Sequence, residues 1–140
     1  MSTGRAAGGR SRVGRNPPPP AAGYALTVPT TPAEAHALAL ALPGSSEAPH
    51  FNRVAFRVGG KVFATLDPHG SDLNLMLSPE LQAEVLAAWT TLTFPVHGGW
   101  GRMGATTVRL DEATSEQVAA LLERSWSRRA PARLRKARGG

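Results

Sequence analysis

The segment Gly98-Gly-Trp-Gly-Arg-Met-Gly104 contains the residues of this chain whose types and spacing are most suggestive of chemistry. Its glycines follow the Gly-x-Gly-x-x-Gly pattern of loops that bind the phosphates of dinucleotides. Such a loop follows a strand and opens a helix, because the helix N-terminus holds the pyrophosphate. The residues after Gly104 are alternating and β-branched, which predicts a strand instead. We therefore predict a glycine-rich connection between two strands and no dinucleotide cofactor.

Trp100 and Arg102 lie at or near the tip of this connection, and two interpretations of them stay open. In the first, Trp100 folds back over the core and Arg102 is a solvated loop charge. In the second, the connection is a flexible wing, in which Arg102 contacts a phosphate and Trp100 stacks on a base or on a partner.

The other reactive side chains do not form a recognisable catalytic or metal-binding motif. The four histidines lack the spacing of metal ligands, and the chain has no cysteine for a disulfide or a thiolate site. We therefore expect a protein that is not an enzyme, with no catalytic residue, no metal and no cofactor. The lack of cysteine, of a signal-like apolar segment and of a membrane-length apolar run predicts a cytoplasmic protein.

The positive net charge of +6 is located at the two ends of the chain. Residues 1–23 contain four arginines and residues 124–140 contain seven basic residues, and neither segment contains an acidic residue. Residues 24–123 contain five basic and ten acidic residues, so this part is net negative. Basic ends of this kind are commonly solvated tails, and they can also bind polyanions without sequence preference.

Hydrophobic periodicity predicts one domain in residues 24–130, after a disordered basic arm (1–23) and before a basic tail (131–140). Helices are predicted after the capping residues Thr31, Ser78 and Thr114. Strands are predicted at 53–58, 61–66, 73–77, 93–96 and 105–110. Because hairpin connections join antiparallel strands, we expect an α+β fold: a two-layer α-β(3)-α-β(2)-α sandwich with helices on one face of a five-stranded antiparallel sheet.

Gly59-Gly60 predicts a tight hairpin that pairs Val58 with Lys61 and Phe56 with Phe63. In this register the larger apolar side chains form one face, which is the better candidate for the core: Val54, Phe56, Val58 and Phe63. The opposite face carries the rest of the hairpin: Arg53, Ala55, Arg57, Val62, Ala64 and Leu66. Arg109 joins this second face if its neighbours point inward. The second face is either a segregated basic surface or only the polar side that an uncovered sheet needs.

Four motifs then occur in order along the chain: Leu42-Pro-Gly44, Val54-Ala-Phe-Arg-Val-Gly-Gly-Lys-Val-Phe-Ala64, Leu75-Met-Leu-Ser-Pro-Glu80, and Trp100-Gly-Arg-Met-Gly104 running into Val108-Arg-Leu110. Together they resemble the MmcQ/YjbR family of small bacterial proteins over roughly residues 30–130. The resemblance implies a sandwich like that of type III secretion chaperones. It also implies DNA binding through two wing-like hairpins, which here would be Arg57 to Lys61 and Trp100 to Arg102.

We therefore predict a nucleic-acid-binding protein, largely without sequence specificity, in which the wings position the chain and the basic C-terminal residues supply most of the affinity. The predicted binding residues are Arg53, Arg57, Lys61, Trp100, Arg102, Arg109, Arg128, Arg129, Arg133, Arg135 and Lys136. The alternative is a protein-interaction module or homodimer that uses the uncovered sheet face in the manner of a chaperone. No membrane partner is expected.

Overall fold

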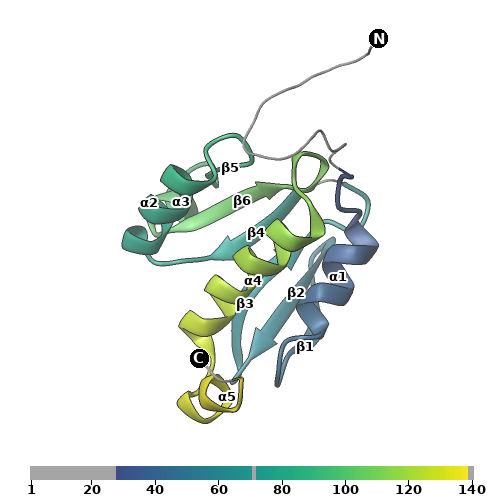
Figure 1. Ribbon diagram of the computed structural model, residues 1–140, viewed down its shortest axis with the longest axis vertical. Helices are drawn as coiled ribbons and strands as arrows, with labels where there is room; N and C mark the ends of the chain where they lie inside the picture. Colours follow the sequence, from purple (N-terminus) through teal and green to yellow (C-terminus); the bar gives the residue numbers. More distant parts are fainter. Residues whose placement is uncertain (1–27, 71, 139–140) are drawn as a thin grey trace.

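The computed structural model of the protein describes residues 28–70 and 72–138 (Figure 1). The predicted arm of residues 1–23 lies outside the described residues. In the described part, no helix combines the length and the apolar composition required to cross a membrane. In chain order, the elements are α1 (Pro32–Leu40), β1 (Ser46–His50), β2 (Arg53–Val58), β3 (Lys61–Leu66), β4 (Asp72–Met76), α2 (Pro79–Ala88), β5 (Thr93–Pro95), α3 (Gly99–Arg102), β6 (Ala105–Arg109), the 3₁₀ helix η1 (Leu110–Glu112), α4 (Ser115–Arg129) and α5 (Ala132–Ala137).

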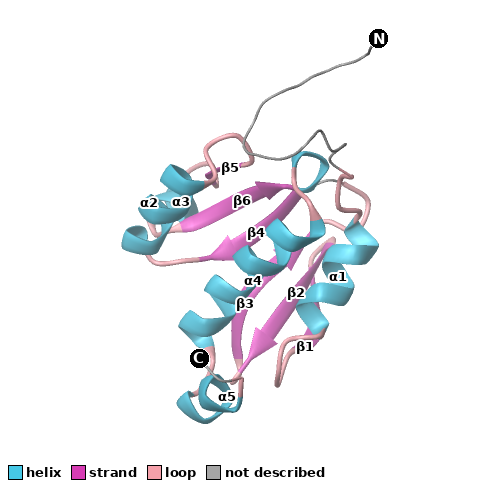
Figure 2. Ribbon diagram, viewed as in Figure 1, coloured by secondary structure: helices cyan, strands magenta, loops and turns pink. Residues whose placement is uncertain are grey.

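The strands form one antiparallel sheet in the order β1-β2-β3-β4-β6-β5. Figure 2 shows α1 and α4 lying across one face of this sheet. Buried side chains of α1, α2 and α4 form a single hydrophobic core with that face, including Ala39, Val85, Leu121 and Leu122. The predicted class, an α+β sandwich with an antiparallel sheet, is confirmed.

The three longest helices begin at the capping residues that the sequence predicts. At the start of α1, Thr31 Oγ1 accepts from the Glu34 N–H at 3.1 Å, and Glu34 Oε1 accepts from the Thr31 N–H at 2.9 Å. Thr114 and Gln117 form the same reciprocal pair at the start of α4. Ser78 caps α2 through its hydroxyl. These bonds satisfy backbone N–H groups that have no partner within the helix.

The sheet has six strands rather than the predicted five, because β1 carries no strand signal in its sequence. Its residues Ser-Glu-Ala-Pro-His do not alternate between apolar and polar types, and most of them are exposed. Pro49 lacks an N–H group, so it is tolerated only where one side of the strand has no partner. β1 meets this condition, since it lies at the edge of the sheet beside β2.

The β2–β3 hairpin also has a register that differs from the prediction. The pair next to the turn is as predicted, but a β-bulge places Phe56 opposite Ala64 rather than Phe63. A bulge inserts one extra residue and shifts the alternation of faces along the strand. As a result Phe63, Ala64 and Leu66 all lie in the core. The prediction that Ala64 and Leu66 occupy the uncovered face is therefore wrong.

Part of the predicted basic tail forms the helix α5, whose Leu134 packs against the core. Leu134 Cδ1 lies 2.6 Å from the point where a side chain on Gly44 would begin. Trp126 is buried nearby, and its Nε1 donates to the carbonyl of Pro43 at 2.9 Å. The folded unit therefore extends past the expected boundary at residue 130, because one leucine docks a helix that is otherwise basic.

We predict that Leu134→Ala lowers the free energy of unfolding by about 1–3 kcal/mol, since a partly buried leucine loses apolar contacts. Chemical denaturation followed by circular dichroism measures this change. Arg133→Ala, at an exposed position of the same helix, is the matched control and should change stability by less than about 0.5 kcal/mol. Equal stability of Leu134→Ala and the unchanged protein would show that α5 does not dock.

Candidate functional site

The predicted binding residues lie in three separate places, and the largest group surrounds the β2–β3 hairpin tip. A side chain on Gly59 would begin 3.0 Å from Pro131 Cδ and 3.8 Å from the carbonyl oxygen of Arg129. The tip therefore packs against the corner between α4 and α5, and Figure 1 shows α5 beside the ends of β2 and β3. We call this region the basic end; its members are Arg57, Lys61, Arg128, Arg129, Arg133, Arg135, Lys136 and Arg138.

Most of the positive charge of the basic end has no counter-charge among the described residues. Arg138 is the exception: its Nε donates to Glu123 Oε2 at 2.9 Å, and its guanidinium lies 5.9 Å from the centroid of the Trp126 ring. The hydrogen bond from Arg138 lowers the pKa of Glu123, so this carboxylate stays charged. Within residues 28–70 and 72–138, the other members make no ion pair. This end of the molecule therefore attracts anions.

Two arginines of the basic end fix its shape through bonds to backbone carbonyls. Arg128 Nη1 donates to the carbonyl of Met76 at 3.1 Å, which ties the end of α4 to the end of β4. Arg135 Nη1 donates to the carbonyl of Ala130 and, at 3.4 Å, to that of Ser127. The last carbonyls of a helix have no intrahelical donor, so Arg135 supplies one and holds α5 against α4.

Arg53 and Arg109 form the second group, at the strand ends farthest from the basic end. Arg53 begins β2 and Arg109 ends β6, whereas Arg57 lies near the hairpin tip. Arg53 Nη1 donates to Asp72 Oδ1 at 3.2 Å, and the Arg109 guanidinium lies 4.7 Å from the centroid of the Phe94 ring. Groups of the protein itself therefore engage both cations. The structure does not bring them together with Arg57, although all three were predicted as binding residues.

The glycine segment forms the short helix α3 between β5 and β6, so the predicted connection between two strands is confirmed. Two of its glycines, Gly101 and Gly104, are required by close backbone contacts. A side chain on Gly101 would begin 1.7 Å from the carbonyl oxygen of Val96, and one on Gly104, where φ is +115°, would begin 2.0 Å from that of Leu77. Gln82 of α2 donates from Nε2 to the carbonyl of Gly101 at 2.9 Å and to that of Ala105, the first residue of β6, at 3.0 Å. The glycine spacing thus serves backbone packing.

Trp100 and Arg102, the third group, are presented to solvent by this α3 segment. Trp100 is 67% exposed and the neighbouring Met103 is 68% exposed. The interpretation that Trp100 covers the core is therefore wrong. Arg102 is also exposed. The third group lies apart from the basic end, since Figure 1 shows α3 and α5 on different sides of the molecule.

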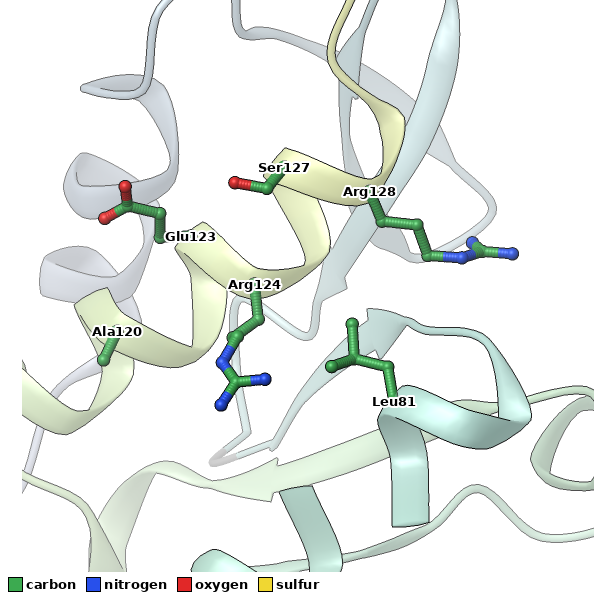
Figure 3. Close-up of a pocket in the computed structure, with 6 residues that line it drawn as sticks. All are labelled: Leu81, Ala120, Glu123, Arg124, Ser127 and Arg128. Atoms are coloured by element: carbon green, nitrogen blue, oxygen red, sulfur yellow. The ribbon is translucent and has the colours of Figure 1, made fainter. Parts of the chain in front are cut away.

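A hollow of about 500 Å³ lies between α2 and α4 (Figure 3). Figure 3 shows Leu81 approaching from α2, while the other lining residues come from α4: Ala120, Glu123, Arg124, Ser127 and Arg128. Arg124 Nη1 lies 3.3 Å from Glu84 Oε1, and Glu123 is held by Arg138. Because Glu123 and Arg124 are paired within the protein and Arg128 is the one lining cation without an ion pair among the described residues, the hollow is less suited to an anion than the basic end.

Two residues that shape these regions were not among the predicted binding residues. Arg138 continues the C-terminal basic run, and the run itself was the signal that could have included it. Gln82 has no sequence signal, because its bonds go to backbone carbonyls of a segment that is distant along the chain.

We predict that Gly101→Ala costs about 2 kcal/mol or more of unfolding free energy, because its new methyl group would overlap the Val96 carbonyl. Gly99→Ala is the matched control, since a side chain there meets only the flexible end of Arg102 at 3.5 Å. Thermal unfolding of both variants measures the difference. Similar melting temperatures for the two would mean that the α3 segment is not held by this contact.

Comparison with known proteins supports one family. A sequence model of the YjbR family matches residues 40–128, so all of α5 and most of the basic end's C-terminal members lie beyond the match. The chain is also similar to the crystal structure of Deinococcus radiodurans protein DR2400, which has a DUF419 domain, with a TM-score of 0.60 and 25% identity over 81% of this chain and 92% of that one. No curated protein matches the chain. Since the family match spans more than half of the sequence, this protein belongs to the YjbR family.

Proposed function

We propose that this protein binds nucleic acid through the phosphate backbone, with the basic end as its main contact, and that it is a binding protein rather than an enzyme. The observation that carries the proposal is the contact of Gly59 with Pro131. This contact adds the cations of the β2–β3 tip to those of α4 and α5. A concentration of unpaired Lys and Arg side chains at one end is the electrostatic footprint of a polyanion-binding protein.

The chemistry of the basic end favours backbone contacts over base recognition. Lys and Arg side chains bind phosphate oxygens and release condensed counterions, which gives affinity without sequence information. Helix α5 has six residues, a length of about 9 Å, so it offers little surface for a row of base edges. We therefore propose binding that is largely independent of sequence.

The α3 segment supports a second contact, with unpaired bases. Trp100 is mostly exposed, and its backbone is held by the close approach of Gly101 to Val96. An exposed indole on a held segment loses little freedom when a base stacks on it, and stacking tolerates any base. Arg102 beside it supplies a charge for the adjoining phosphate.

A second candidate function is protein interaction or dimerisation through the sheet face opposite the core. This face carries one row of residues that crosses all six strands: Ala48, Ala55, Thr65, Asn74, Thr107 and Phe94. Phe94 is 39% exposed and favours such a contact. However, Ala64 and Leu66 lie in the core, so the face is mainly small and polar. A less apolar face has less to gain from a partner, and this candidate ranks second.

We predict that Arg57→Gln reduces the salt dependence of duplex DNA binding, lowering the log–log slope by about 0.9, because one phosphate contact is lost. Fluorescence anisotropy at several salt concentrations measures this slope. Arg109→Gln is the matched control, since it removes an exposed arginine from a strand end far from the hairpin tip. The same slope change in both variants would contradict the assignment of the basic end.

For the α3 segment, we predict that Trp100→Ala weakens binding to single-stranded oligothymidine by about 5- to 150-fold, the effect of losing one stacked base. Met103→Ala removes an equally exposed neighbour and should have little effect. Duplex binding by Trp100→Ala should stay nearly unchanged. Unaltered single-strand affinity of Trp100→Ala would remove α3 from the proposed interface.

A further inference from the structure

The arginines of the described residues are generally satisfied in one of two ways, and Arg129 fits neither. Arg53 and Arg124 are partly buried, and each donates to a carboxylate of the protein. Arg57 and Arg133 make no such bond within the described residues, but both are exposed to water. Arg129 is half-buried, and its Nε is buried with no hydrogen-bond partner among residues 28–70 and 72–138. An orphaned buried donor of this kind is rare in native proteins and calls for an acceptor.

The charge of Arg129 is poorly compensated by its surroundings. Burial lowers the pKa of its guanidinium, and repulsion from Arg128 lowers it further. The carbonyls of Ser127 and Ala130 at the end of α4 accept from Arg135. The nearest acidic residue of the same helix, Glu123, is bound by Arg138. These three acceptors close to Arg129 in sequence are therefore engaged by other arginines.

We infer that Arg129 anchors one phosphate group at the corner between α4 and α5. A phosphate presents several acceptor oxygens, and the planar guanidinium fork can donate to two of them at once. Bound there, a phosphate would accept from the guanidinium and neutralise the repulsion between Arg128 and Arg129. A turn of the side chain toward the phosphate would also bring the buried Nε to an acceptor. The phosphate belongs either to a nucleic-acid backbone or to a free polyphosphate.

The position of Arg129 in the fold suits a central phosphate contact, because other cations lie near it. Its carbonyl lies beside Gly59, so the hairpin tip with Lys61 adjoins the same corner. The inferred Arg129 site makes the proposed function more specific, because it identifies the phosphate contact around which the other cations are arranged. It rests on the proposed function only for the source of the phosphate. Arg129 lies just outside the residues matched by the family, 40–128.

Thermal unfolding of the full chain at low salt tests the inference, with sodium tripolyphosphate and a 20-base-pair duplex as separate ligands. Either ligand, well above its Kd, should raise the Tm of the unchanged protein by about 4 °C or more. Arg129→Lys keeps the charge but lacks the donor fork, so it should lose most of this shift. Arg109→Lys makes the same replacement at an exposed position far from the basic end and should keep it. Without ligand, Arg129→Lys should melt no lower than the unchanged protein.

The two ligands separate the outcomes. A shift with the duplex alone that depends on Arg129 supports the anchor and identifies the nucleic-acid backbone as the source. A shift with tripolyphosphate alone that depends on Arg129 supports the anchor but contradicts the proposed function. If Arg129→Lys responds to both ligands as the unchanged protein does, or if neither ligand shifts the Tm, the anchor is refuted. Duplex binding measured separately by anisotropy then decides whether the proposed function survives.

Discussion

The geometry of the basic end depends on the burial of Trp126 near the end of α4. Its side chain is 1% exposed, and its Nε1 donates to the Pro43 carbonyl at 2.9 Å. This arrangement buries a large apolar surface and satisfies the only donor of the indole. It fixes the last turn of α4 beside the end of α1, so that Pro131 meets Gly59 at the hairpin tip. The C-terminal cations therefore belong to a folded corner rather than to a free tail.

The docking of α5 at this corner gives part of the basic charge a fixed position on the protein surface. The total charge of +6 combines a net negative segment, residues 24–123, with basic ends. Because α5 docks, part of that basic charge becomes a directional feature of the folded surface. Interactions between exposed charges fade beyond a Debye length of about 8–10 Å, so gathering the cations at one end determines which part of the protein a polyanion meets first. Arg53, which is paired with Asp72, and Arg109, which lies over Phe94 at a strand end far from the basic end, contribute little to this directionality.

The α3 segment illustrates how one glycine spacing can satisfy two different physical needs. In a dinucleotide-binding loop, glycines let the backbone approach a pyrophosphate. Here Gly101 and Gly104 let it approach the carbonyls of Val96 and Leu77. The requirement for a missing Cβ is the same, but the neighbour is the chain itself. This packing places Trp100 outward at 67% exposure, which makes it available for stacking.

The sequence by itself determined the helix starts at Thr31, Ser78 and Thr114, the antiparallel class and the connection between β5 and β6, because caps, alternation and turn glycines act between near neighbours in the chain. It also revealed the family and most of the cations of the basic end. Three features depend on tertiary contacts alone: the edge strand β1, the bulge that places Ala64 in the core, and the docking of α5. Whether a given arginine is paired, exposed or orphaned depends likewise on tertiary contacts, since burial and partners come from segments that meet only after folding. Signals between near neighbours in the sequence do not predict contacts between distant segments. The candidate site depends on one such contact, that of Gly59 with Pro131.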